Sequence, residues 1–234
     1  MARVFITGSA DGLGRLTAET LLGEGHEVVV HARSAERLGA VGDLLERGAS
    51  GVVGDLADIG QTRAVAERAG RVDVVVHNAG VYRDARVMPV NVVAPYLLTA
   101  LIDGPSRLVY LTSGMHRGGR PDVGLLGAGS YSDSKLFVTT LALAVARRWP
   151  GVLSNAVDPG WVPTRMGGPG APDDLRLGHR TQEWLATSDD PAARTSGGYW
   201  YHQRRHDPHP SAADPRFQDR LLGALAELTG TPLP

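Results

Sequence analysis

A chain of 234 residues is long enough for one domain with a large buried core and short for two. Its formal net charge of −1, with 42% hydrophobic and 21% charged residues, fits a globular protein and gives no sign of a nucleic-acid partner. The absence of cysteine excludes disulfides and is compatible with a reducing cytoplasm. No signal-peptide pattern or bilayer-length apolar run is present, so we expect a cytoplasmic protein without a membrane partner.

Short β-branched segments alternate with helix-length amphipathic segments from the first residues onward. The predicted strands are 3–7, 27–31, 50–54, 72–77, 107–112 and 152–157. The predicted helices include 13–22, 34–46, 58–69, 131–149 and about 216–228. Continuous apolar strands are expected to be buried on both faces. The pattern predicts an α/β fold over residues 1–234, with a single Rossmann-type, doubly wound parallel sheet and helices on both faces.

The first motif is TGSADGLG, residues 7–14, which joins the first predicted strand to the first predicted helix. Glycines at positions 8, 12 and 14 let the backbone turn tightly and approach a pyrophosphate, whose charge would face the start of the helix. A glycine-rich turn of this kind also occurs without a ligand. It is not a P-loop, because no GK[ST] sequence follows.

The stretch YSDSKLF, residues 131–137, contains the only lysine in a chain that otherwise uses arginine. Tyr131 and Lys135 are four residues apart, so both lie on one face of a helix. A cation beside a phenol favours the phenolate and is expected to lower the tyrosine pKa from about 10 toward neutrality. The planar guanidinium of arginine does not readily replace a compact ammonium in this role. The pair therefore indicates acid–base chemistry, with a chance exposed pair as the alternative.

These motifs together resemble the short-chain dehydrogenase/reductase family. HNAG at 77–80, Asn91, Ser113 and DPGWVPT at 158–164 continue the match in the family's order. His77 stands where the family usually has a first asparagine, a mild departure.

The resemblance implies catalytic roles for Asn91, Ser113, Tyr131 and Lys135. Tyr131 would be the general acid/base, Ser113 would hold and polarise the substrate oxygen, and Asn91 would complete a proton relay with Lys135 through water. The alternatives are an ordinary serine at a strand end, with Thr112 as the competing hydroxyl, and an asparagine that only caps a helix.

The resemblance also implies a bound dinucleotide, and the end of the second strand selects it. HARS at 31–34 offers Arg33 and Ser34 to the 2′-phosphate of NADP, whereas Asp11 is a weak argument for NAD, so we expect NADP (NADPH) with NAD less favoured. The implied cofactor-binding residues are Gly8, Ser9, Gly12, Leu13, Gly14, Arg33, Ser34, Asp55, Leu56, Asn78, Ala79, Gly80, Tyr131, Lys135, Pro159, Gly160, Val162 and Thr164. The dinucleotide-binding part would span about 1–150 and the substrate loop about 158–190.

Two departures from the family pattern concern the substrate side. The stretch from NAG to Asn91 is short, which predicts a trimmed helix, and the loop at 114–130 is enlarged. The enlarged loop and 158–168 are most similar to the bacterial retinol-dehydrogenase-like branch. An apolar substrate is suggested by rim candidates Met115, Trp161, Met166 and Trp184. The histidines at 202, 206 and 209 lie in a polar, turn-rich segment, which we interpret as a solvated loop without a metal.

The helix at 131–149 is apolar all round, so both of its sides are expected to be covered. The resemblance implies a second subunit on the outer side, in a homodimer or homotetramer; coverage by the same chain is the alternative. The predicted function is an NADP(H)-dependent oxidoreductase, a carbonyl reductase or alcohol dehydrogenase, that interconverts a carbonyl and a secondary alcohol. An epimerase or dehydratase with bound NADP, or a non-catalytic dinucleotide sensor, is the alternative.

Overall fold

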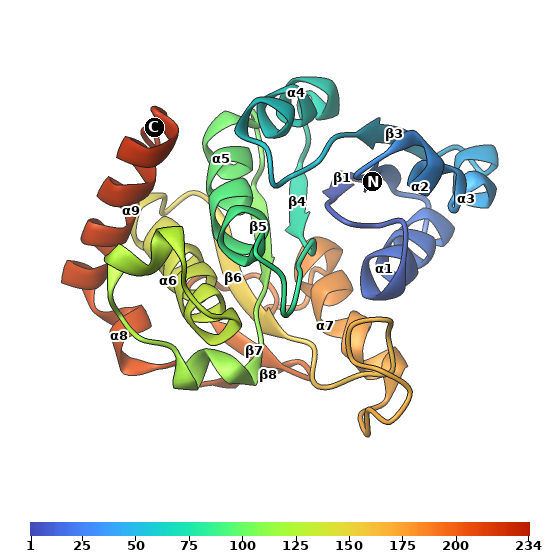
Figure 1. The fold of residues 1–234 in the computed structure, drawn as a ribbon. Coiled ribbons are helices and arrows are strands. Elements are labelled where there is room, and N and C mark those ends of the chain that lie inside the picture. Colours follow the sequence, from blue (N-terminus) through green and yellow to red (C-terminus); the bar gives the residue numbers. More distant parts are fainter.

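The structure is a computed structural model that describes residues 1–234. One sheet of eight strands runs through the molecule in the order β3-β2-β1-β4-β5-β6-β7-β8, and only the β7–β8 pair is antiparallel (Figure 1). The strands are β1 (Arg3–Ile6), β2 (Glu27–Ala32), β3 (Ser50–Val53), β4 (Val74–His77), β5 (Arg107–Leu111), β6 (Leu153–Asp158), β7 (Tyr199–Tyr201) and β8 (Arg204–His206). The strand order reverses between β1 and β4, where sheets of this kind bind ligands.

Helices cover both faces of the sheet. The helices are α1 (Gly12–Gly23), α2 (Ala35–Gly39), α3 (Gly42–Glu46), α4 (Ile59–Ala69), α5 (Ala94–Leu101), α6 (Tyr131–Arg148), α7 (Leu175–Thr187), α8 (Pro210–Ala213) and α9 (Pro215–Thr229), with a π-helix η1 (Pro89–Val93) and 3₁₀ helices η2 (Gly114–Gly118) and η3 (Val123–Gly127). One core lies between the sheet and α4, α5 and α6, and a second lies between the sheet and α1, α3 and α7. This arrangement confirms the predicted fold class. None of the helices has the length and hydrophobicity that crossing a membrane requires.

Two predictions about local structure are wrong. The helix expected at 34–46 is broken into α2 and α3. Val41 leaves the helical conformation and buries its side chain in the core. In the sequence it lies between Gly39 and Gly42, and glycine weakens a helix. The segment expected to be an irregular loop near the carboxyl end contains the β7–β8 hairpin, whose turn residues His202 and Gln203 both have positive φ. Strands of three residues carry too little alternation to be recognised in a sequence.

The helix α6 is buried on nearly all sides, and the covering comes from its own chain. The helices η2, α8 and α9 pack against it, with the Phe137 and Phe217 rings 5.9 Å apart, and Figure 1 shows α9 beside α6. The Trp149 indole donates a hydrogen bond to the Pro234 carbonyl at 2.9 Å, which fixes the end of the chain there. The alternative, coverage by the same chain, is observed for most of α6, and a second subunit on this side stays a prediction. The number of subunits stays a prediction.

Candidate active site

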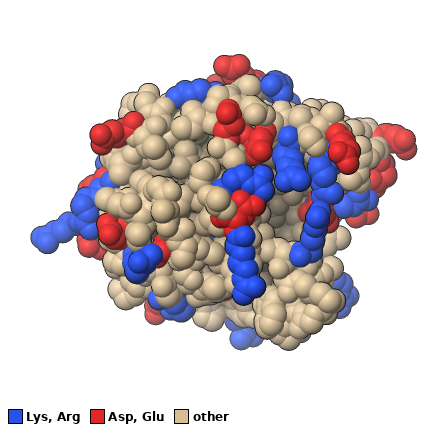
Figure 2. Space-filling view, in the orientation of Figure 1, with Lys and Arg blue, Asp and Glu red and all other residues tan.

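A cavity of about 570 Å³ lies at the carboxyl ends of the central strands, where the strand order reverses. The turns after β1, β2, β3 and β4, the first residues of α6 and the loop after β6 line this cavity. Figure 2 shows a hollow near the middle of this face, with arginine side chains along its borders. The volume is in the range of cofactor and substrate pockets.

The glycine-rich turn after β1 is held by the asparagine of the NAG segment. Gly8 has a φ of +63°, a conformation that glycine adopts without strain. The Asn78 amide donates hydrogen bonds to the Thr7 carbonyl at 2.8 Å and to the Gly8 carbonyl at 3.1 Å. A Cβ atom at Gly14 would lie only 2.3 Å from the Asn78 amide nitrogen. Glycine at this position therefore lets α1 start close to the turn, where the unpaired N–H groups of its first turn suit an anion.

The charged residues near the ends of β1 and β2 differ in whether they form an ion pair. Arg33 is exposed, lines the cavity and forms no ion pair within the chain. Asp11 accepts a hydrogen bond from the Gly12 N–H at 2.8 Å and forms an ion pair with Arg37 at 3.2 Å. The Ser34 hydroxyl accepts a hydrogen bond from the Arg37 N–H at 3.3 Å and so caps α2. The negative charge of Asp11 is balanced by Arg37, and Arg33 is free to bind an anion.

Some predicted cofactor residues lie behind the wall of the cavity and not on it. These residues are Ser9, Gly14, Ser34, Gly160 and Val162. The Ser9 hydroxyl is fully buried and donates a hydrogen bond to the Ile6 carbonyl at 2.9 Å. Val162 is buried against α7, where a Cβ atom at Gly178 would lie 2.7 Å from it. These residues shape the loops that line the cavity, and the other predicted cofactor residues are on its surface.

The loop between NAG and η1 contributes residues that the sequence did not identify. Asp84 and Arg86 line the cavity and form an ion pair at 2.6 Å, and Arg86 also lies 3.9 Å from the predicted Asp55. Tyr82 packs edge-on against the Tyr131 ring, with the ring centroids 4.8 Å apart. The loop has no regular secondary structure, so periodicity offered no signal for placing these side chains.

The first residue of α6 is Tyr131, and a dense set of hydrogen bonds fixes this end of the helix. Ser130 and Asp133 form a capping box, in which each side chain accepts a hydrogen bond from the other residue's backbone N–H. The buried Asp133 carboxylate also forms an ion pair with Arg120 at 2.8 Å, and Arg120 comes from the enlarged loop. The loop that separates Ser113 from Tyr131 therefore helps to position the tyrosine.

Lys135 and Asn91 lie beside Gly80, the last residue of the NAG segment. Lys135 is buried, and its ammonium donates a hydrogen bond to the Leu111 carbonyl at 2.9 Å. The Asn91 side chain pairs with the Val81 backbone, accepting from its N–H at 2.9 Å and donating to its carbonyl at 3.1 Å. A Cβ atom at Gly80 would lie 3.5 Å from the Asn91 oxygen and 3.6 Å from the Lys135 nitrogen. Both side chains therefore flank one glycine, and Asn91 lies inside η1 instead of capping a helix.

The acid–base properties of the pair differ from the sequence-based expectation. Lys135 lies 5.4 Å from the centroid of the Tyr131 ring. Burial raises the pKa of Tyr131 to about 12, the charge of Asp158 adds to this effect, and hydrogen bonding with Ser113 opposes it. Burial lowers the pKa of Lys135 to about 8, and Asp158 opposes that shift. The expected lowering of the tyrosine pKa is therefore wrong for the chain alone, because burial of the phenol and the charge of Asp158 outweigh the hydrogen bond with Ser113.

The hydroxyl groups of Thr112 and Ser113, at the end of β5, have different surroundings. Thr112 is buried, and its hydroxyl donates to the Lys135 carbonyl at 3.0 Å and bonds with the Thr139 hydroxyl at 2.7 Å. Ser113 is only partly buried, and its oxygen accepts a hydrogen bond from the Met115 N–H at 3.2 Å. Ser113 also forms a side-chain hydrogen bond with Tyr131, so its hydroxyl lies beside the phenol and is the one placed to polarise a substrate oxygen.

The loop after β6 closes one side of the cavity. Pro159 and Thr164 line it, and a Cβ atom at Gly12 would lie 3.6 Å from the Thr164 methyl group. Asp158, which the sequence analysis placed only within a motif, accepts hydrogen bonds from the Tyr199 hydroxyl at 2.9 Å and the Gly160 N–H at 3.0 Å. It is the acidic group whose charge acts on both Tyr131 and Lys135.

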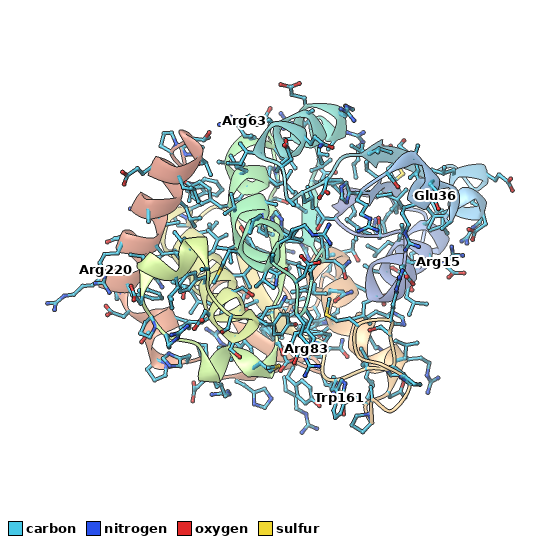
Figure 3. The ribbon with its side chains drawn as sticks, viewed as in Figure 1. Arg15, Glu36, Arg63, Arg83, Trp161 and Arg220 are labelled. Carbon is cyan, nitrogen blue, oxygen red and sulfur yellow. The ribbon has the colours of Figure 1, made fainter.

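Large apolar side chains are exposed on the loops that carry the site residues, and of these Tyr82 and Met166 line the cavity. The exposed fractions are 38% for Tyr82, 46% for Met115, 60% for Trp161 and 48% for Met166. Figure 3 labels Trp161 in the lower part of the view, in the loop after β6. Trp184 does not belong to this rim, because it lies on α7 and packs against Trp200 with the ring centroids 5.1 Å apart. No three His, Cys, Asp or Glu side chains are arranged to hold a metal ion.

Comparison with known proteins places these features in a family. Residues 2–174 match the family model described as short chain dehydrogenase. The chain is 36% identical to "Uncharacterized oxidoreductase AN7799" of Emericella nidulans, with 100% of this chain and 99% of the relative covered. It is 35% identical to "Short-chain dehydrogenase chyC" of Penicillium rubens, with both chains covered completely. A solved structure, a blue fluorescent protein from a metagenomic library in complex with NADPH, superposes with a TM-score of 0.72 at 24% identity, over 85% of this chain and 95% of the other.

Proposed function

The chain belongs to the short-chain dehydrogenase family, and we propose that it is an NADP(H)-dependent oxidoreductase that interconverts a carbonyl and a secondary alcohol. The observation that carries this proposal is that Tyr131 and Lys135 line the same cavity as the glycine-rich turn, with Ser113 hydrogen-bonded to Tyr131 and Asn91 beside Lys135 at Gly80. A hydroxyl, a phenol and a buried ammonium beside a dinucleotide-sized cavity suit proton transfer coupled to hydride transfer.

Tyr131 supplies the proton in the direction of carbonyl reduction. Its pKa of about 12 keeps the phenol protonated at neutral pH, which is the state that can donate to a carbonyl oxygen. The Ser113 hydroxyl, beside Tyr131, donates a hydrogen bond to the same oxygen and stabilises its developing negative charge. Bound NADPH supplies the hydride in this reaction.

Lys135 and Asn91 support the return of the proton to Tyr131. The Lys135 pKa of about 8 means that this ammonium can release a proton near neutral pH more easily than an exposed lysine. Because its nitrogen and the Asn91 oxygen flank Gly80, a short chain of water molecules can connect them to solvent. Lys135 thus holds and passes a proton, and arginine could not do this at neutral pH.

The groups around the adenosine end favour NADP over NAD. Arg33 lines the cavity without an ion-pair partner, so its guanidinium is available for the 2′-phosphate. Asp11, which would oppose a phosphate, is paired with Arg37 at 3.2 Å. Arg33 is therefore the cation at this end of the cavity that no ion pair balances.

The rim supports an apolar carbonyl substrate. Tyr82, Met115, Trp161 and Met166 expose apolar surface around the catalytic hydroxyls, and exposed apolar side chains that gather at a cavity mouth are typical of ligand-binding surfaces. Burial of these side chains by the substrate would provide most of the binding free energy.

Binding and turnover test the proposal in sequence. Fluorescence titration with NADPH and NADH measures the two dissociation constants, and absorbance then follows NADPH consumption with a panel of apolar ketones and aldehydes. We expect NADPH to bind more tightly and to be consumed, with Tyr131→Phe as the control that binds but does not turn over. Failure of both cofactors to bind would refute the proposal, and turnover that survives in Tyr131→Phe would refute the role of the tyrosine.

A further inference from the structure

A histidine at the end of β2 has both ring nitrogens in hydrogen bonds with turns of the cavity. His31 is almost completely buried and lines the inner part of the cavity. Its Nδ1 accepts a hydrogen bond from the Gly8 N–H at 3.0 Å, and its Nε2 lies 2.9 Å from the Gly54 carbonyl oxygen. One side chain therefore connects the glycine-rich turn after β1 to the turn after β3.

These two partners allow only one protonation state of the ring. The Gly54 carbonyl can only accept, so Nε2 carries the hydrogen, and the Gly8 N–H can only donate, so Nδ1 carries none. An imidazolium would place a second hydrogen at Nδ1, directly against the Gly8 N–H. Protonation of His31 is therefore incompatible with the observed position of the Gly8 turn.

The backbone of His31 strengthens the same connection. Its N–H donates to the Ser9 hydroxyl at 2.7 Å, and its carbonyl accepts from the Ser9 N–H at 3.0 Å. On its other side the turn packs closely against the NAG segment, since a Cβ atom at Gly8 would lie 2.9 Å from the Ala79 Cα. The Gly8 backbone is thus held between His31 and the NAG segment, in the turn expected to contact the pyrophosphate.

We propose that His31 is a positioning residue for the dinucleotide: its Nε2–H tautomer fixes the glycine-rich turn in the binding conformation, and cofactor affinity depends on Nδ1 remaining unprotonated. This inference rests on the proposed function. It gives a role to a residue that the family motifs do not include, and it predicts a pH dependence that belongs to the protein and not to the cofactor.

The surroundings of His31 favour the neutral ring at physiological pH. Burial lowers the pKa of His31 from its usual value of 6.5, while the hydrogen bond to Gly54 and the negative charge of Asp55 oppose that shift. Phe5 packs edge-on against the ring from β1, with the centroids 6.4 Å apart, and adds no charge. Arg33, which follows the end of β2, lines the same cavity. Loss of affinity is therefore expected only below about pH 6.5.

Two nearly isosteric substitutions separate the two hydrogen bonds. The amide oxygen of His31→Asn stands at the position of Nδ1 and can accept from Gly8, but the side chain does not reach Gly54. The amide nitrogen of His31→Gln stands at the position of Nε2 and can donate to Gly54, but it leaves Gly8 without its partner. We expect His31→Asn to bind NADP⁺ within about threefold of the unchanged chain and His31→Gln to bind about tenfold more weakly, the effect of one lost hydrogen bond.

Calorimetric titration with NADP⁺ and NAD⁺ between about pH 7.5 and pH 4.5 provides the decisive measurement, with circular dichroism to check folding at each pH. NAD⁺ lacks the 2′-phosphate, so a loss of NAD⁺ affinity in acid reports on the protein. We expect at least about a threefold loss for the unchanged chain and a flat profile for His31→Asn. The inference would be overturned if the NAD⁺ affinity of the unchanged chain did not change with pH. It would also be overturned if His31→Asn and His31→Gln lost equal affinity for NADP⁺. No binding of either dinucleotide at neutral pH would instead refute the proposed function.

Discussion

The dinucleotide end and the substrate mouth of this cavity are built in different ways. At the dinucleotide end, side chains such as Asn78, His31 and Ser9 bond to backbone atoms of neighbouring strands and turns, and glycines permit contacts that no side chain could make. At the mouth, Trp161 and Met166 are exposed side chains on irregular loops. One end is fixed by the protein's own hydrogen bonds, and the other presents surface that a substrate must cover.

This difference separates what the fold requires from what the reaction requires. A change at the dinucleotide end disturbs buried polar groups that have no alternative partners, so it affects folding and cofactor binding together. A change at the mouth removes apolar contact area from exposed loops, which affects substrate binding and little else. Substitutions that act on one property at a time can test this division.

The largest effect is expected at Tyr131, which stands between the two regions. Tyr131→Phe removes the proton donor and keeps the ring that packs against Tyr82, so the fold and the NADPH dissociation constant should hardly change. Turnover should fall by about 10³-fold, within the range of general acid–base contributions. Stopped assays of NADPH oxidation over hours measure the residual rate. A fall of less than about tenfold would assign the proton transfer to another group.

The second effect tests the close packing at the dinucleotide end. Gly14→Ala would place a methyl group 2.3 Å from the Asn78 amide nitrogen and 2.8 Å from the Gly8 carbonyl oxygen. We expect a loss of about 1–3 kcal/mol in the free energy of unfolding and weaker NADP⁺ binding, measured by urea unfolding and calorimetry.

The matched control is Gly223→Ala, because Gly223 lies within α9 and a Cβ atom there meets nothing within 4 Å. It should leave NADP⁺ binding unchanged and raise the free energy of unfolding by up to about 1 kcal/mol. If both variants lost equal stability, the tight contact at Gly14 would not be the cause.

The third effect follows from the loss of one positive charge and changes the preference for NADPH over NADH. Arg33→Ala should weaken NADPH binding by about 10- to 100-fold, the contribution of hydrogen bonds to a charged group, and leave NADH binding unchanged. Arg220→Ala is the control, since Arg220 lies on α9, does not line the cavity and is labelled at the left of the view in Figure 3. The ratio of the two dissociation constants is the measurement. An unchanged ratio in Arg33→Ala would move the 2′-phosphate site to another cation.

The same division explains what the sequence could predict. Turns such as 7–14 and the segment 77–80 follow predicted strands directly, so their places at the carboxyl edge of the sheet came from the strand order. The i, i+4 spacing placed Lys135 beside Tyr131 for a similar local reason. Strand positions and helix spacing are short-range properties, and a single sequence contains them.

Properties that depend on packing could not be predicted in this way. The sign of the Tyr131 pKa shift was missed because desolvation depends on how completely the folded chain surrounds the phenol. The partner of Asp11 was missed because Arg37 reaches it only after α2 begins. The covering of α6 by α9 joins segments far apart in the chain, and no local pattern marks which apolar face meets which.

The smallest effect should come from the mouth, where exposed Trp161 can be compared with packed Trp184 on α7. Trp161→Ala removes a side chain that is 60% exposed, so the KM for an apolar ketone should rise by about three- to tenfold with kcat and the free energy of unfolding nearly unchanged. Trp184→Ala removes a ring packed against Trp200 on α7 and should lower stability without changing KM. Opposite results from chemically identical substitutions would show that substrate recognition resides in the exposed loops. Equal effects on KM would mean that α7 and the mouth respond as one unit, and the division between a fixed end and an adaptable end would have to be abandoned.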